Sequence, residues 1–191
     1  MARIRDAIAL HSSAAPSEPV PPFTRASVAL VLRARRSAPE LLMIKRAEHE
    51  SDPWSGHMAF PGGRCDPEDP DPRATALRES REELALDLAV ADHLGELSPL
   101  KTPFRARGRV HYVHAHVFGV AQVPLLRPNY EVASVHWFAL DRLLAGEGRD
   151  TFEYSLQGQP WPMPCVRLDG CFIWGMSLRL IDDLLERLRA P

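Results

Sequence analysis

The sequence predicts an α/β protein in which helices pack on the faces of a mixed β-sheet. The chain has 191 residues, of which 45% are hydrophobic; this is enough for one domain with a full core and little for two. Apolar segments of strand length outnumber the helical segments, and the helices interrupt the strands. We therefore expect a short helix and a lead-in over residues 1–25, followed by a single domain over residues 26–191.

Short apolar segments, rich in β-branched residues, predict the strands. These strands are expected at residues 26–32, 41–45, 58–60, 94–98, 110–120, 132–139, 151–156 and 166–173. The third of them lies inside a loop over residues 52–63, in which Pro and Gly are frequent. Residues 11–22 are rich in Ser, Ala and Pro, which is typical of an extended lead-in.

Apolar residues at helical spacing predict helices between and after the strands. Ile4 and Ile8 fall on one side of a short first helix. Asp71 followed by Pro72 is typical of an N-cap and a first helical residue, so a helix should run from there to about Ala85. A short helix is expected at residues 141–144, and an amphipathic helix at residues 175–188 ends the chain.

Composition argues against several classes of partner. The formal net charge is −2, so no basic excess indicates nucleic-acid or membrane-surface binding. No apolar run approaches the roughly 20 residues that span a bilayer. Cys65, Cys165 and Cys171 are odd in number and lack metal-type pairing, which favours free thiols in a reducing cytoplasm. We expect a cytoplasmic monomer or homodimer.

Three glutamates on the helix that follows Asp71 suggest a cation site. Glu79, Glu82 and Glu83 are spaced i, i+3 and i+4 and therefore point the same way, whereas Ser80 and Leu84 face the opposite side. Oxygen ligands of this kind suit Mg²⁺ or Mn²⁺ better than Zn²⁺. The alternative is an ordinary solvated charged face, on which Arg78 and Glu82 form an i, i+4 pair.

A glycine turn precedes this helix at Phe60-Pro61-Gly62-Gly63. Two glycines let the backbone turn tightly and approach a ligand closely, so a carbonyl here could join the carboxylates at a metal. Pro-Gly-Gly is also a frequent plain turn.

Together these segments resemble the Nudix box, a glycine and an acid followed by Arg-Glu-hydrophobe-X-Glu-Glu-X-Gly-hydrophobe. The sequence reads Gly63-Arg64-Cys65-Asp66-Pro67-Glu68-Asp69 and then Arg78-Glu79-Ser80-Arg81-Glu82-Glu83-Leu84-Ala85-Leu86. It departs from the box in a spacer one residue longer, in Asp69 for Glu, in Ser80 for a hydrophobe and in Ala85 for the glycine. The resemblance implies a Nudix-type α/β/α sandwich with a mixed β-sheet.

Within that superfamily, the upstream element resembles the coenzyme A diphosphatase branch. The element reads Leu41-Leu42, then Arg46-Ala47, then Gly56-His57-Met58-Ala59-Phe60-Pro61-Gly62-Gly63. Ala47 replaces the usual Ser, and the expected Arg within the spacer is missing. This partial match implies hydrolysis of coenzyme A or its thioesters to 3',5'-ADP and 4'-phosphopantetheine.

The resemblance also implies roles for individual residues. Glu79, Glu82, Glu83 and the Gly63 carbonyl would bind Mg²⁺ or Mn²⁺, with Arg78 orienting one of the carboxylates. Glu82 is the first candidate for the base, followed by Glu131, whose alternative interpretation is a surface loop acid. Arg46 would meet a phosphate, or else is a surface Arg at a strand end. Independently of the resemblance, Trp54, Phe60 and Trp174 could stack on an adenine, although aromatic residues are more often part of the core.

Two other functions remain open at this stage. The chain could hydrolyse another nucleotide, such as ADP-ribose or an oxidised dNTP, or it could be a Nudix-like sensor that binds a nucleotide without turnover. Sensors are expected to lose acids of the box, whereas Arg78 and all three helix glutamates are present here. His114 and His116 share one face of a predicted strand, and we expect them to face solvent rather than to line the cleft.

Overall fold

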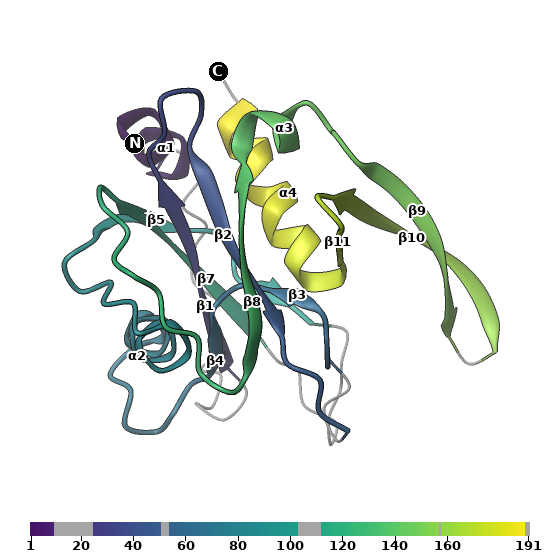
Figure 1. Cartoon of the computed structure of the whole chain (residues 1–191), viewed down its shortest axis with the longest axis horizontal. Coiled ribbons are helices and arrows are strands. Elements are labelled where there is room, and N and C mark those ends of the chain that lie inside the picture. Colours follow the sequence, from purple (N-terminus) through teal and green to yellow (C-terminus); the bar gives the residue numbers. More distant parts are fainter. Residues whose placement is uncertain (10–24, 51–53, 103–111, 157, 190–191) are drawn as a thin grey trace.

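The computed structural model describes residues 1–9, 25–50, 54–102, 112–156 and 158–189. Within these ranges, helices cover both faces of a central β-sheet, and a second, smaller sheet lies beside the C-terminal helix (Figure 1). The predicted lead-in at residues 11–22 and the first residues of the strand predicted at 110–120 lie outside the described residues.

The central sheet has the strand order β3-β2-β1-β7-β5, with β4 paired to β1, β6 to β7 and β8 to β2. Its strands are β1 (Arg25–Arg33), β2 (Glu40–Arg46), β3 (Met58–Ala59), β4 (Gly62–Arg64), β5 (Asp92–Glu96), β6 (Leu100–Lys101), β7 (Tyr112–Val120) and β8 (Val132–Ala139). The pair β1–β7 is parallel and the other pairs are antiparallel, which confirms the predicted mixed sheet. The two strands β4 and β6 were not predicted.

Alternate residues of the central strands point to two separate apolar cores. Leu30 and Leu32 of β1 belong to a core that includes α1 (Ala2–Ala9) and α4 (Gly175–Arg189), whereas Ala29 and Val31 belong to a core that includes α2 (Pro72–Leu84). The sheet is therefore the middle layer of three, with α2 on one face and α1 and α4 on the other (Figure 1). Within the described residues, no helix is both long and apolar enough to cross a membrane.

The C-terminal third forms a separate three-stranded antiparallel sheet after the short helix α3 (Leu140–Leu144). Its strands are β9 (Arg149–Leu156), β10 (Gln159–Leu168) and β11 (Cys171–Trp174). The strand pieces predicted over residues 166–173 are the end of β10 and the start of β11, and a turn separates them because Asp169 and Gly170 adopt φ values of 50° and 75°. Asn and Asp tolerate this left-handed region better than most residues, which explains the turn at Asp169.

The two strand histidines do not face solvent as predicted. His116 is 5% exposed, because β7 lies inside the sheet between β1 and β5 and is covered by the α2 layer. His114 is half-buried, and its Nδ1 lies 2.7 Å from Glu96 Oε1. Desolvation of His116 lowers its pKa to about 4, so the imidazole is neutral near pH 7.

The helix α2 begins and ends close to the predicted residues. Asp71 accepts a hydrogen bond from the Ala74 N–H at 2.7 Å, as an N-cap does, and Pro72 is the first helical residue. At the other end Ala85 is left-handed, with φ 54° and ψ 29°, and the Leu86 N–H donates to the Ser80 carbonyl at 3.2 Å. The Ala85 N–H also donates to the Arg81 carbonyl at 2.9 Å, which is the bond of an αL-type C-terminus, where glycine is the favoured residue.

Replacing Ala85 with glycine is therefore expected to stabilise the protein. The left-handed conformation costs an L-residue with a Cβ about 1 kcal/mol, which glycine avoids. Urea unfolding should show a higher midpoint and a free energy of unfolding greater by about 1 kcal/mol. An unchanged or lower midpoint for Ala85→Gly would contradict the strained conformation of Ala85.

Candidate active site

The acidic residues of α2 lie where the helix passes over β4 and β1. Ser80 and Leu84 are fully buried against the sheet, as predicted, and the Ser80 hydroxyl is satisfied by the Ala76 carbonyl at 2.7 Å. The three glutamates differ in exposure. Glu83 is 2% exposed, Glu79 is partly buried, and the Glu82 side chain is 54% exposed.

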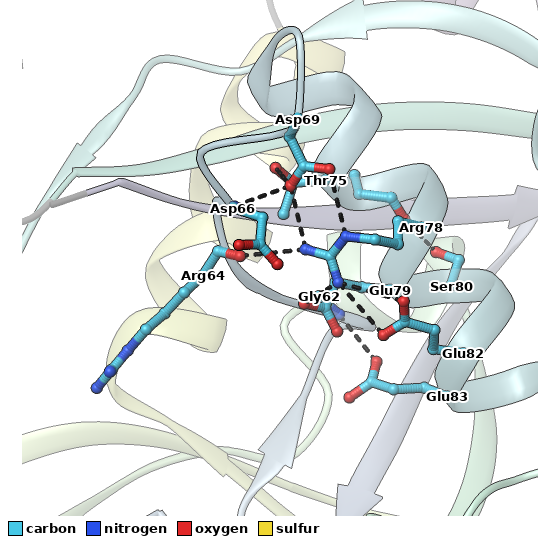
Figure 2. A network of polar contacts seen from close by, with 11 residues as sticks. Gly62, Arg64, Asp66, Asp69, Thr75, Arg78, Glu79, Ser80, Glu82 and Glu83 are labelled. Atoms are coloured by element: carbon cyan, nitrogen blue, oxygen red, sulfur yellow. Dashed lines mark hydrogen bonds and ion pairs between the residues drawn. The ribbon is translucent and has the colours of Figure 1, made fainter. Parts of the chain in front are cut away.

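The glycine turn approaches these glutamates closely, as its sequence predicts. Gly62 has φ 153°, and a Cβ there would collide with the Ser27 carbonyl of β1. A Cβ at Gly63 would collide with the Glu79 carboxylate. Gly62 also donates its N–H to Glu83 Oε2 at 2.9 Å. Gly62 is thus required for the turn to lie between the sheet and the acidic side of α2, whereas a side chain at Gly63 would displace the Glu79 carboxylate (Figure 2).

Burial raises the pKa values of the two inner glutamates. Desolvation is the largest cause for Glu83, whose pKa is raised to about 8 by burial and by the charges of Glu79 and Glu131, against the Gly62 hydrogen bond and Arg46. Desolvation also raises the pKa of Glu79, against the charge and hydrogen bond of Arg78. Crowded acids in a partly dehydrated place are costly to ionise without a cation.

Arg78 joins the loop before α2 to two of these glutamates (Figure 2). Its Nε and Nη2 donate to Oδ1 and Oδ2 of Asp69 at 3.3 and 3.1 Å. Its Nη1 donates to Glu79 Oε1 at 3.0 Å and to Glu82 Oε2 at 3.3 Å, and Nη2 reaches the Arg64 carbonyl at 3.3 Å. The hydrogen bond with Asp69 raises the pKa of Arg78 despite partial desolvation, so the guanidinium remains charged while it orients the carboxylates.

The carboxylate of Asp69 is itself held by the loop and the helix. Asp69 Oδ2 accepts from the Asp66 N–H at 2.9 Å and from the Thr75 hydroxyl at 2.8 Å, in addition to Arg78. Desolvation opposes its ionisation, yet these hydrogen bonds keep the pKa of Asp69 below its usual range. Asp69 corresponds to the acid of the box, whereas no sequence motif indicates a role for Asp66 or Thr75.

The loop before β8 brings Glu131 toward the inner glutamates. The Asn129 N–H donates to the Glu83 carbonyl at 2.9 Å, and Asn129 Oδ1 accepts from the Glu131 N–H at 2.9 Å. The Glu131 carbonyl accepts from the Ala47 N–H at 2.7 Å, directly after Arg46. Glu131 is exposed, and its charge contributes to the raised pKa values of Glu79 and Glu83. Asn129, which no sequence motif indicates, therefore couples this loop to α2.

Of the two predicted substrate contacts, Arg46 lies close enough to Glu83 for its charge to lower the pKa of that carboxyl. Phe60 is 3% exposed and belongs to the core on the α4 side of the sheet. Its ring is therefore part of the core, and we do not retain Phe60 as a substrate contact.

The side chains that converge here suit a hard divalent cation. Glu79, Glu83 and the glycine turn offer oxygen donors only, and Glu83 is a buried carboxylate that forms no salt bridge with any described residue. In the described part of the chain, no group of three or more His, Cys, Asp or Glu side chains is arranged so that it could hold a metal ion. The reason is local: Arg78 draws Glu79 and Glu82 to itself, while Glu83 points to Gly62.

Comparison with curated proteins gives one clear family. The sequence model of the NUDIX domain matches residues 23–156. A Yersinia pestis protein described as the uncharacterized Nudix hydrolase NudL is 29% identical over 153 residues, which cover 80% of this chain and 74% of that protein.

Comparison with solved structures gives the same fold. The MutT protein of Methanosarcina mazei Go1 matches with a TM-score of 0.54 and 18% identity, over 87% of this chain and 93% of that one. The NUDIX domain of Shewanella oneidensis NrtR, crystallised with ADP ribose, matches with a TM-score of 0.53 and 18% identity, over 86% and 87% of the two chains. The predicted Nudix-type α/β fold is confirmed, and the chain belongs to the Nudix hydrolase family.

Proposed function

We propose that this chain is a metal-dependent hydrolase that cleaves the diphosphate bond of coenzyme A or its thioesters. The observation that carries the hydrolase proposal is the burial of Glu83, which lies with Glu79 against the glycine turn and whose pKa is raised to about 8. A cation bound there would offset the cost of ionising both acids. The presence of the box acids also argues against a sensor without turnover.

Each residue then has a defined task. Glu79, Glu82, Glu83 and the Gly63 carbonyl would hold Mg²⁺ or Mn²⁺, which neutralises phosphate oxygens and acidifies a water molecule. Arg78 orients Glu79 and Glu82 through the hydrogen bonds described above. Glu82 and Glu131 are the more exposed acids, which supports either of them as the base that would take a proton from an incoming water. Arg46 would bind a phosphate of the nucleotide.

The choice of coenzyme A is supported by the upstream element and by the position of Arg46. The strands β2 and β3, which carry that element, are adjacent: the Arg46 N–H donates to the His57 carbonyl at 3.0 Å. The element thus lies beside the glutamate site, where the groups attached to the diphosphate of the substrate would bind. Other nucleoside diphosphate derivatives share the diphosphate chemistry, so the substrate requires a direct test.

Incubation of the protein with coenzyme A, ADP-ribose and several dNTPs, each with Mg²⁺ and with Mn²⁺, should yield 3',5'-ADP and 4'-phosphopantetheine from coenzyme A. Mass spectrometry of the products would identify the bond that is cleaved. Preferential cleavage of ADP-ribose or of an oxidised dNTP would overturn the coenzyme A assignment alone. Nucleotide binding in EDTA without turnover of any substrate would favour the sensor and overturn the hydrolase.

A further inference from the structure

We propose that Thr75 is a positioning residue for the metal-binding glutamates, acting through Asp69 and Arg78. The inference rests on the proposed metal-dependent function and extends it to a residue outside the box acids. Thr75 lies in the first turn of α2 and is fully buried, and its hydroxyl donates to Asp69 rather than to a glutamate.

The hydroxyl of Thr75 has one proton, and its geometry commits that proton to Asp69. Thr75 Oγ1 lies 2.8 Å from Asp69 Oδ2. The Asp69 carboxylate is the favoured acceptor for this proton, because hydrogen bonds to a charged group are about twice as strong as those between neutral groups. The Cys65 thiol also lies within hydrogen-bonding reach of Thr75. Desolvation by burial raises the pKa of that thiol, against the interaction with Thr75, and a neutral thiol is a weaker acceptor than the Asp69 carboxylate.

The position of Asp69 depends on this bond because the residue lies in a loop. Its other non-arginine partner is the Asp66 N–H at 2.9 Å, which belongs to the same loop. Thr75 is therefore the group that ties the Asp69 carboxylate to α2, the helix that carries the glutamates (Figure 2). Without the Thr75 hydroxyl, the remaining contacts of the Asp69 carboxylate are with its own loop and with the Arg78 side chain, whose orientation itself depends on Asp69.

Arg78 transmits the position of Asp69 to the glutamates. Two of its nitrogens are held by Asp69, which sets the plane of the guanidinium. The third nitrogen, Nη1, then points at Glu79 and Glu82. A planar guanidinium held at two points has little freedom at the third. Loss of the Thr75 hydroxyl should therefore loosen the carboxylates of Glu79 and Glu82 without removing any metal ligand.

The test is equilibrium Mn²⁺ binding without substrate, measured from the electron paramagnetic resonance signal of free Mn²⁺. Thr75→Val keeps the shape and removes the hydroxyl, and it should weaken Mn²⁺ binding about tenfold, since partners of metal ligands typically contribute 10- to 100-fold. Thr75→Ser keeps the hydroxyl and should bind within about twofold of wild type. Thr75→Ala also lacks the hydroxyl and should repeat the loss seen for Thr75→Val.

Thr102→Val is the matched control. Thr102 is another buried threonine, and its hydroxyl has no hydrogen-bond partner in the described part of the protein. The same substitution there should leave Mn²⁺ binding unchanged. In turnover assays, Thr75→Val should raise the Mn²⁺ concentration for half-maximal activity more than the KM for the nucleotide.

Two outcomes would overturn the inference while leaving the proposed function in place. One is folded Thr75→Val that binds Mn²⁺ as wild type does. The other is a Thr75→Ser protein that binds Mn²⁺ as weakly as Thr75→Val does, which would assign the loss to packing rather than to the hydroxyl. A wild-type protein that binds no Mn²⁺ would instead overturn both this inference and the metal-dependent function.

Discussion

Replacing Glu83 with glutamine is expected to abolish metal-dependent turnover and to leave the fold intact. The substitution keeps the shape of the side chain and removes the negative charge at the most buried position of the site. Loss of a partner of a metal ligand costs 10- to 100-fold, so loss of a ligand itself should cost at least about a hundredfold in kcat/KM. Steady-state assays at saturating Mn²⁺, with circular dichroism to confirm the fold, would measure the effect.

Glu68→Gln provides the control for this substitution. Glu68 lies in the spacer of the same box and is exposed, so its variant should retain wild-type activity. If Glu83→Gln hydrolysed the substrate at nearly the wild-type rate, Glu83 would have no part in the mechanism, and the buried carboxylate would need another explanation.

The local signals of the sequence predicted most of the fold because they are short-range. The start of α2 follows from Asp71 and Pro72, which act on neighbouring backbone groups. The spacing of Glu79, Glu82 and Glu83 likewise fixes which side of the helix they share. What spacing cannot give is depth: Glu83 is buried because α2 crosses β4, where the Gly62 N–H meets its carboxylate.

The errors come from contacts between distant segments. His116 is buried because β7 lies within the sheet, between β1 and β5. Phe60 enters the core beneath α4, more than a hundred residues later in the chain. The alternation of polar and apolar residues within one segment does not show which strands will lie beside it or which helix will cover it.

The supporting residues of the site were missed for the same reason. Asn129 donates its backbone N–H to the Glu83 carbonyl from a loop that is distant in sequence, and its side chain accepts from the Glu131 N–H. Thr75 is closer, but its contact with Asp69 depends on the turn that the Asp66 and Asp69 backbones form. The ligand candidates can be found from side-chain chemistry, whereas the groups that position them depend on loop geometry.

The same buried carboxylate gives a second large effect, on stability rather than on rate. In EDTA, wild-type protein should lose stability relative to Glu83→Gln as the pH rises from about 4.5 to about 8. The pKa of Glu83 is raised from 4.5 to about 8 in the folded protein, so in this window the folded state retains a proton that the unfolded chain has released. Its contribution to stability is complete below pH 4.5 and is lost as the pH rises through 8.

The size of the loss follows from the width of that window. One pH unit corresponds to at most about 1.4 kcal/mol, so the whole window corresponds to at most about 5 kcal/mol, and to less than that where the folded site relaxes and admits water. Urea unfolding at pH 5, 6, 7 and 8 in EDTA would give the difference between wild type and Glu83→Gln at each pH. Glu68→Gln should follow wild type at every pH.

Divalent cations should reverse this loss in wild type alone. A cation that binds the folded state stabilises it by mass action and favours the ionised carboxylate. Millimolar Mn²⁺ should therefore raise the free energy of unfolding of wild type more at pH 8 than at pH 5, because fewer protons compete for Glu83 at the higher pH. The same addition should stabilise Glu83→Gln far less. Equal stabilisation of the two proteins by Mn²⁺ would show that Glu83 does not bind the cation. A wild-type stability in EDTA that does not fall relative to Glu83→Gln between pH 5 and 8 would show that the pKa of Glu83 is not raised.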